Sequence, residues 1–206
     1  MDSSGSRKAA TVFLPYLRVF TTAEASQILE FAVALPLLAV FIVGTFDFSQ
    51  AFNLKQKLNN AAREGARFAS NLPTNDLSNA TSCGSPPSPA SVCAVRDLVS
   101  AYLQKARIND CGLSTKGASA TTPWTYVASG NGCPAGGDLT LTVDRSYAFT
   151  ATVPGASGPL YVVSSRVTLS YPYQWHFGNV IQFLVPGASY AAITQISTDA
   201  VVPNMD

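Results

Sequence analysis

The sequence predicts an α+β fold: a long N-terminal helix, a short second helix, and an antiparallel sheet of three to four strands. Three observations predict it. Residues 31–46 form an uncharged apolar run that continues directly into an amphipathic helical pattern. Residues 89–108 carry apolar side chains at helical spacing. After Gly112, apolar and polar residues alternate as they do in half-buried strands.

The long helix is expected to begin at Glu24 or Ser26 and to end at Leu72, before Pro73. Pro36 lies inside it and should kink it locally, as membrane helices tolerate. As a helix, residues 31–46 would cover about 24 Å at ~1.5 Å per residue. A bilayer core is about 30 Å thick, so apolar residues on both sides of the run must also enter it. The helix is therefore predicted to span a membrane.

Glu30 stands directly before the uncharged run and Asp47 directly after it. Because the uncharged run is shorter than the bilayer core, we expect Glu30 to lie inside the apolar layer or at its edge. A carboxylate at the bilayer centre costs roughly 2.5–3.5 kcal/mol, and less near the end of a span, so such a residue is functional by default. The alternative is that the Glu30 side chain simply reaches the interface, and spacing alone does not separate the two interpretations.

Small residues recur at four-residue spacing in the amphipathic half of the helix, at Ala61, Gly65 and Ala69. Such a stripe allows a second helix to approach closely. The partner is either a helix of another subunit or the C-terminal domain of this chain, and the pattern fits both.

The rest of the chain, residues 73–206, is predicted to form one α+β domain. A Ser-, Asn-, Thr- and Pro-rich loop, 73–89, precedes the second helix. Pro154 to Pro159 reads as the turn of a hairpin between two alternating runs. The predicted strands lie near residues 139–144, 161–175 and 190–201, with a short edge strand from Trp124.

Composition restricts the partners and the compartment. Charged residues make up 12% of the chain and the net charge is +1, so no nucleic-acid partner is indicated. All four cysteines follow the span: Cys83, Cys93, Cys111 and Cys133. Their number and the lack of C-x-x-C pairs favour disulfides in an oxidising compartment over a zinc site. We expect Cys83 and Cys93 to staple the 73–89 loop; the sequence does not pair all four.

An enzyme is not indicated. The one histidine, His176, lies among aromatic residues and is expected to have a packing role. Asp138 and Asp144 have no second carboxylate nearby, and the glycine clusters lack a phosphate-binding pattern. No catalytic residue, metal or cofactor is therefore predicted.

The segments ASQILEFAVALPLLAVFIVGTFDFSQAF and LNNAAREGARFAS resemble the TadE family, pseudopilin-like proteins of the Tad or Flp pilus machinery. The resemblance implies that a prepilin peptidase removes residues 1–25, a cytoplasmic leader, at the Ala25–Ser26 bond. The family more often has glycine before this bond, where this chain has Ala25. The resemblance also implies that Glu30 pairs with the terminal amine of a neighbouring subunit, and that residues 73–206 face the periplasm or the exterior.

Two functions follow as expectations. The first is a minor pilin or pseudopilin, anchored in the bacterial inner membrane by one pass (residues 26–72), whose partners are membrane lipid and other pilin-like subunits. The second is a membrane-anchored binding domain that never enters a filament.

The positive charges near the span favour the opposite topology, with a cytoplasmic C-terminus, because more of them follow the span than precede it. Those that follow are Lys55, Lys57, Arg63 and Arg67; those that precede are Arg7, Lys8 and Arg18.

Overall fold

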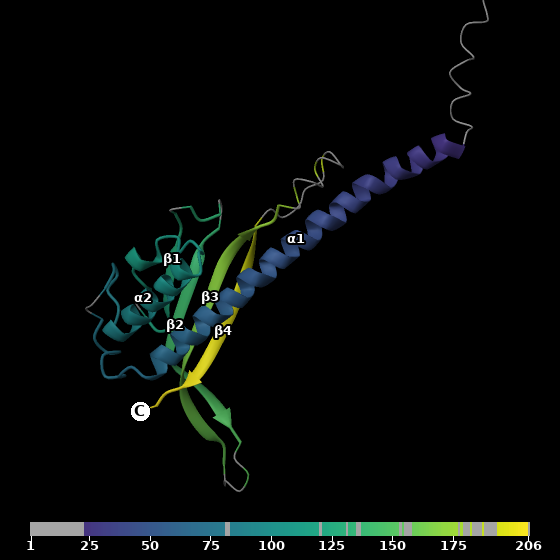
Figure 1. Ribbon diagram of the computed structural model, residues 1–206. Helices are drawn as coiled ribbons and strands as arrows, with labels where there is room; N and C mark the ends of the chain where they lie inside the picture. Colours follow the sequence, from purple (N-terminus) through teal and green to yellow (C-terminus); the bar gives the residue numbers. More distant parts are fainter. Residues whose placement is uncertain are drawn as a thin grey trace, which may run out of the picture.

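The computed structural model confirms the α+β class, with two α-helices and a four-stranded antiparallel sheet among the residues it describes (Figure 1). It describes residues 23–80, 83–119, 121–130, 132–134, 137–152, 154, 158–176, 178, 182, 187 and 193–205. The elements are α1 (Ala23–Ser70), α2 (Ala90–Lys105), the 3-10 helix η2 (Leu113–Thr115), β1 (Trp124–Ala128), β2 (Leu139–Ala151), β3 (Leu160–Gln174) and β4 (Ile193–Pro203). Most of the predicted leader lies outside the described residues.

The sheet has the strand order β1-β2-β3-β4, with every neighbouring pair antiparallel. The second half of α1 lies along the sheet and contacts β3, β4 and α2, while the first half projects away from it (Figure 1). Strand β2 is longer than the alternating run predicts and continues to Ala151, whereas β3 has almost the predicted bounds. The core therefore forms between the sheet and the C-terminal half of α1.

The periodic residues of the sequence meet in this core. On β2, Leu139, Leu141 and Val143 are fully buried, as the alternation predicts. The apolar stripe of α2 is buried with them at Val92, Val95, Val99 and Leu103. A period of two on the strands and of about 3.6 on the helices thus directs both sets of side chains to one interior.

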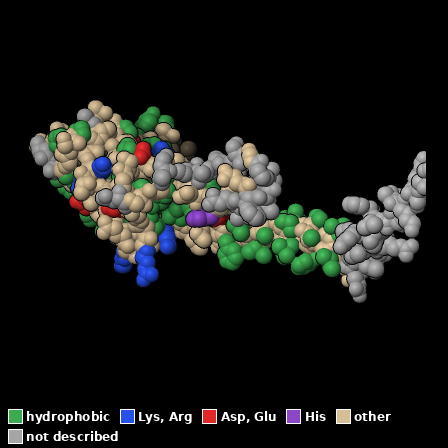
Figure 2. Space-filling view, turned by 90° about the horizontal axis from the view of Figure 1, so that it is seen from above, with side chains coloured by type: hydrophobic (Ala, Val, Ile, Leu, Met, Phe, Trp, Pro, Cys, Tyr) green, Lys and Arg blue, Asp and Glu red, His purple; other side chains and the backbone are tan. Residues whose placement is uncertain are grey.

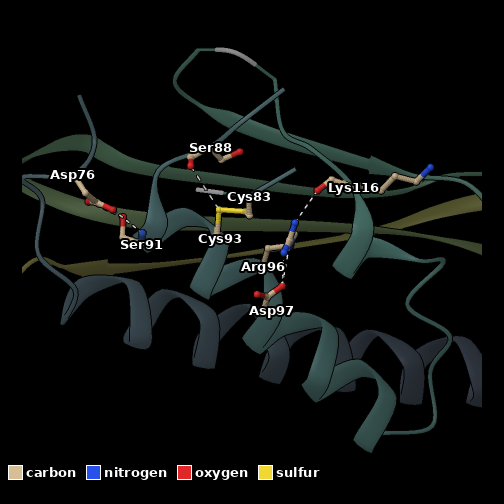
Figure 3. Close-up of a disulfide and its surroundings, with 8 residues drawn as sticks. All are labelled: Asp76, Cys83, Ser88, Ser91, Cys93, Arg96, Asp97 and Lys116. Atoms are coloured by element: carbon tan, nitrogen blue, oxygen red, sulfur yellow. Dashed lines mark hydrogen bonds and ion pairs between the residues drawn. A yellow bond between two sulfur atoms is a disulfide. The ribbon is translucent and has the colours of Figure 1, made fainter. Parts of the chain in front are cut away.

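Two disulfides hold the loops around α2. Cys83 is bonded to Cys93 and Cys111 to Cys133, with Cα–Cα distances of 6.0 and 5.1 Å. The first pair staples the loop before α2, as expected (Figure 3). Beside it, the Asp76 carboxylate accepts hydrogen bonds from the Ser91 backbone N–H at 2.6 Å and from Ser91 Oγ at 3.0 Å. The first turn of α2 is therefore fixed to the preceding loop twice.

Arg145 ties the end of α1 to the sheet. Its side chain is 1% exposed and lies at a β-bulge between Asp144 and Tyr147. The guanidinium donates to the carbonyl oxygens of Leu72 and Pro73, the latter from Nη1 at 2.8 Å. Because helix C-termini carry partial negative charge, a buried cation just beyond the end of α1 is well placed.

A two-stranded arm extends beyond the sheet. It consists of residues 148–151 of β2 paired with residues 160–163 of β3, because β1 pairs only with residues 139–143 of β2 and β4 pairs with β3 from Ser164 onward. The arm exposes Phe149, Leu160, Tyr161 and Val163. It lies at the end of the domain opposite the free half of α1 (Figure 1).

Candidate membrane-spanning and assembly site

The free half of α1 presents apolar side chains on all sides. An 18-residue window of this helix has a mean hydropathy of 2.3, and none of that window is buried within the protein. Figure 2 shows the same segment as a hydrophobic rod that projects from a mixed polar domain. The exposed large side chains are Ile28, Leu29, Phe31, Val33, Leu35, Leu37, Leu38, Phe41, Ile42 and Phe46. The helix is thus long and apolar enough to cross a membrane.

Glu30 is the only charged residue between Ser26 and Phe46, and its side chain is exposed. It follows Ser26 by four positions, so about 6 Å of helix rise separates the two residues. Ser26 is also exposed, while the side chain of Ala25 lies outside the described residues. The α1 helix continues through Pro36 as one element of 48 residues.

Asp47, at the other end of the apolar run, is enclosed by the protein. Its side chain is only 3% exposed, and Oδ1 lies 3.3 Å from Nδ1 of His176. Tyr173 donates a hydrogen bond to the Asp47 backbone carbonyl at 3.1 Å. Burial of the Tyr173 ring raises the pKa of its hydroxyl, and the negative charge of Asp47 raises it further. The domain thereby covers the first charge that follows the span.

The sequence did not predict this contact. His176 was expected to pack among aromatic residues, but its side chain is largely exposed and faces Asp47. The aromatic contacts are made by its neighbours: Trp175 meets Phe48 and Tyr173 edge-on, at ring-centroid distances of 5.3 and 5.0 Å. The one signal in the sequence was that Asp47 directly follows the apolar run.

The small-residue stripe packs inside the protein. Ala61, Gly65 and Ala69 are all buried. A Cβ atom at Gly65 would lie 2.9 Å from Cγ2 of Val99 on α2 and 3.5 Å from Cγ1 of Val167 on β3. Of the two partners that the sequence left open, the stripe therefore contacts the chain's own domain.

We expect Gly65→Leu to lower the free energy of unfolding by about 1–3 kcal/mol, because extra volume in a packed core forces neighbouring atoms to shift. Urea denaturation followed by circular dichroism would measure it. Arg67→Leu, on the exposed face of the same helix, is the control and should change little. Equal stability of Gly65→Leu and wild type would show that the stripe is free for another subunit.

Fold and helix together define the class: an α+β protein with an N-terminal helix able to span a membrane. The model of one protein family, described as TadE-like protein, matches residues 25–67 and confirms the resemblance seen in the sequence. The match covers most of α1, including Glu30, Asp47 and the first two residues of the small-residue stripe, Ala61 and Gly65. No curated protein and no solved structure matches the chain.

Proposed function

We propose that the protein is a non-enzymatic minor pilin or pseudopilin of a Tad-type pilus system, which acts by packing the free half of α1 among other helices. The observation that carries the proposal is this half-helix, which is apolar on all sides, bears one exposed carboxylate, and continues unbroken into a folded domain. The TadE-like match over residues 25–67 supports a role related to the Tad pilus.

Glu30 supplies the register in this proposal. After cleavage at Ala25–Ser26, the new amine of Ser26 and the Glu30 carboxylate lie about one turn apart, near the same end of the apolar half of α1. The amine of one subunit can then pair with the Glu30 carboxylate of a neighbouring subunit. A desolvated carboxylate is costly alone and tolerated when paired, so only the correctly staggered neighbour satisfies it.

The two disulfides support an exported domain, because such bonds persist in oxidising compartments. The excess of positive charge after the span argues for the reverse topology. Lys57, one of these charges, donates to the Ala106 carbonyl at 3.2 Å, which gives it a role in joining α1 to the end of α2. We therefore place the domain in the periplasm or outside the cell.

A second candidate is the membrane-anchored binding domain. It is favoured by the arm of β2 and β3, whose exposed Leu160, Tyr161 and Val163 lie far from the membrane end of α1. Exposed apolar side chains on an open two-stranded ribbon are typical of a surface that meets another protein. In this candidate the arm is the functional site and α1 is only an anchor.

Glu30→Gln separates the two candidates, because it keeps the shape of the side chain and removes its charge. Removal of one partner from a fully buried pair costs about 3–5 kcal/mol, and less at a membrane edge. A loss of ~1.4 kcal/mol already lowers incorporation about tenfold. We expect less of the variant in sheared pili, with its insertion into the membrane retained or improved.

The experiment compares wild type, Glu30→Gln and the control Gln27→Ala at equal expression in the native host. The mature N-terminus is sequenced in membrane and filament fractions. Ala25→Gly should speed leader removal, and a bulky residue at this position should stop it. Normal incorporation of Glu30→Gln, together with wild-type protein that still begins at Met1, would contradict the pilin proposal and favour the anchored binding domain.

A further inference from the structure

A groove opens where α1 leaves the apolar run and meets the edge of the sheet. It has a volume of about 440 Å³ and lies between α1 and the β3–β4 end of the domain. Its floor and walls are mainly apolar, with one cation at the rim. The lining residues are Phe48, Ala51, Phe52, Lys55, Trp175, Gln195, Ile196 and Ser197.

Trp175 is held in a fixed position at this groove. Its indole Nε1 donates to Thr194 Oγ1 at 2.8 Å, and its ring contacts Phe48. Phe48 and Phe52 are each 64% exposed, so the aromatic wall faces outward. Tryptophan with one polar edge satisfied and an apolar face open is the residue typical of the membrane–water interface.

The groove is continuous with the surface of the span. A neighbouring hollow on α1 is lined by Val40, Phe41, Gly44, Thr45 and Phe48. Phe48 therefore belongs to both hollows. An apolar trough runs from the middle of the span to the edge of the domain, and a molecule that covers the first part lies against the second.

The exposed charges of α1 indicate how far its apolar surface extends. Asp47 does not end the apolar surface, because it is buried beside His176. After Glu30, the next exposed charge on α1 is Lys55. Lys55 follows Glu30 by 25 positions, a helix rise of about 38 Å at ~1.5 Å per residue. This length lies between the ~30 Å of the hydrocarbon core and the ~40–45 Å of the whole bilayer, so Lys55 reaches the headgroup level.

We infer that this groove binds a phospholipid of the surrounding bilayer, so that the base of the domain rests in the headgroup layer. An acyl chain lies along Phe48 and Phe52, and the Lys55 ammonium meets the anionic phosphate. Trp175 is the interfacial anchor of the domain. The inference shares with the proposed function the placement of α1 in a bilayer, and it adds a lipid contact made by the folded domain.

The chain offers a direct test, because it has two tryptophans in different surroundings. Trp124 is buried in β1, whereas Trp175 lines the groove. The full chain is reconstituted into vesicles of phosphatidylcholine and phosphatidylglycerol, with plain acyl chains or with acyl chains brominated near the headgroup. In Trp124→Phe, which retains Trp175, we expect brominated lipid to remove most of the emission. In Trp175→Phe, which retains Trp124, emission should not change.

Should Trp124→Phe fail to fold, the difference between wild type and Trp175→Phe reports Trp175 directly. Because Lys55 meets an anionic headgroup, we expect Trp175 emission to differ between vesicles with and without phosphatidylglycerol. Lys55→Gln should abolish this difference. Arg67→Gln, farther along the same helix, is the matched control and should preserve it.

Flotation of the vesicles separates this inference from the proposed function. Protein that floats with the vesicles while Trp175 remains unquenched would overturn the lipid contact alone, and would mean that protein covers the groove. Protein that does not float would overturn both.

Discussion

Removal of both disulfides is expected to lower the free energy of unfolding of the domain by about 5–6 kcal/mol. The bonds close loops with sequence separations of 10 and 22 residues. Crosslinks of loops of this size restrict the unfolded chain by about 3 kcal/mol each. The free energy of unfolding of a folded domain is only about 5–15 kcal/mol in total, so the reduced protein should be close to unfolding at 25 °C.

Urea denaturation of the oxidised and the dithiothreitol-reduced protein measures this loss. A variant with serine at Cys83, Cys93, Cys111 and Cys133 is the control, because reduction should leave its midpoint unchanged. Four reactive thiols in protein purified from native membranes would contradict the prediction, and they would favour the topology that the charge count indicates.

Arg145→Met is expected to lower the free energy of unfolding by about 2–5 kcal/mol. The guanidinium is buried and donates to the carbonyls of Leu72 and Pro73, directly after α1. Methionine fills similar space, but it leaves both acceptors without this donor, at about 1–3 kcal/mol for each buried group. The connection between the end of α1 and the sheet should therefore weaken.

Arg166→Met on the neighbouring strand is the matched control. The Arg166 side chain is 40% exposed and pairs with Asp199 at 3.2 Å. Exposed pairs of this kind contribute about 0–1 kcal/mol. Urea midpoints of the two variants, measured in the same detergent, compare the positions directly. A loss at Arg145 no larger than that at Arg166 would show that the buried contact does not stabilise the domain.

Local periodicity predicted much of this fold from the sequence. The uncharged run and the helical spacing after it predicted α1 to within a few residues of its end at Ser70. Such a prediction is possible because the polarity of each residue indicates which side of the element is buried. The alternation of Leu139, Leu141 and Val143 predicted the buried face of β2 for the same reason.

The contacts that join distant segments were beyond such reasoning. Asp47 and His176 are 129 positions apart, and Arg145 and Leu72 are 73 apart. No local pattern records which bulge or loop will meet which helix end. The small-residue stripe was ambiguous for another reason: Ala61, Gly65 and Ala69 allow close approach by any partner, and only the packed domain identifies Val99 and Val167.

The unbroken path of α1 has a mechanical consequence. One helix of 48 residues is about 72 Å long, at ~1.5 Å per residue, and its second half lies along the sheet. Within α1, the apolar half and the half that packs on the sheet thus belong to one continuous helix, which contains Pro36. Membrane helices adjust to bilayer thickness by tilting, with an average tilt of about 20°. With α1 in a bilayer as proposed, a tilt of the helix would also reorient the domain that packs on its second half, and with it the arm of β2 and β3.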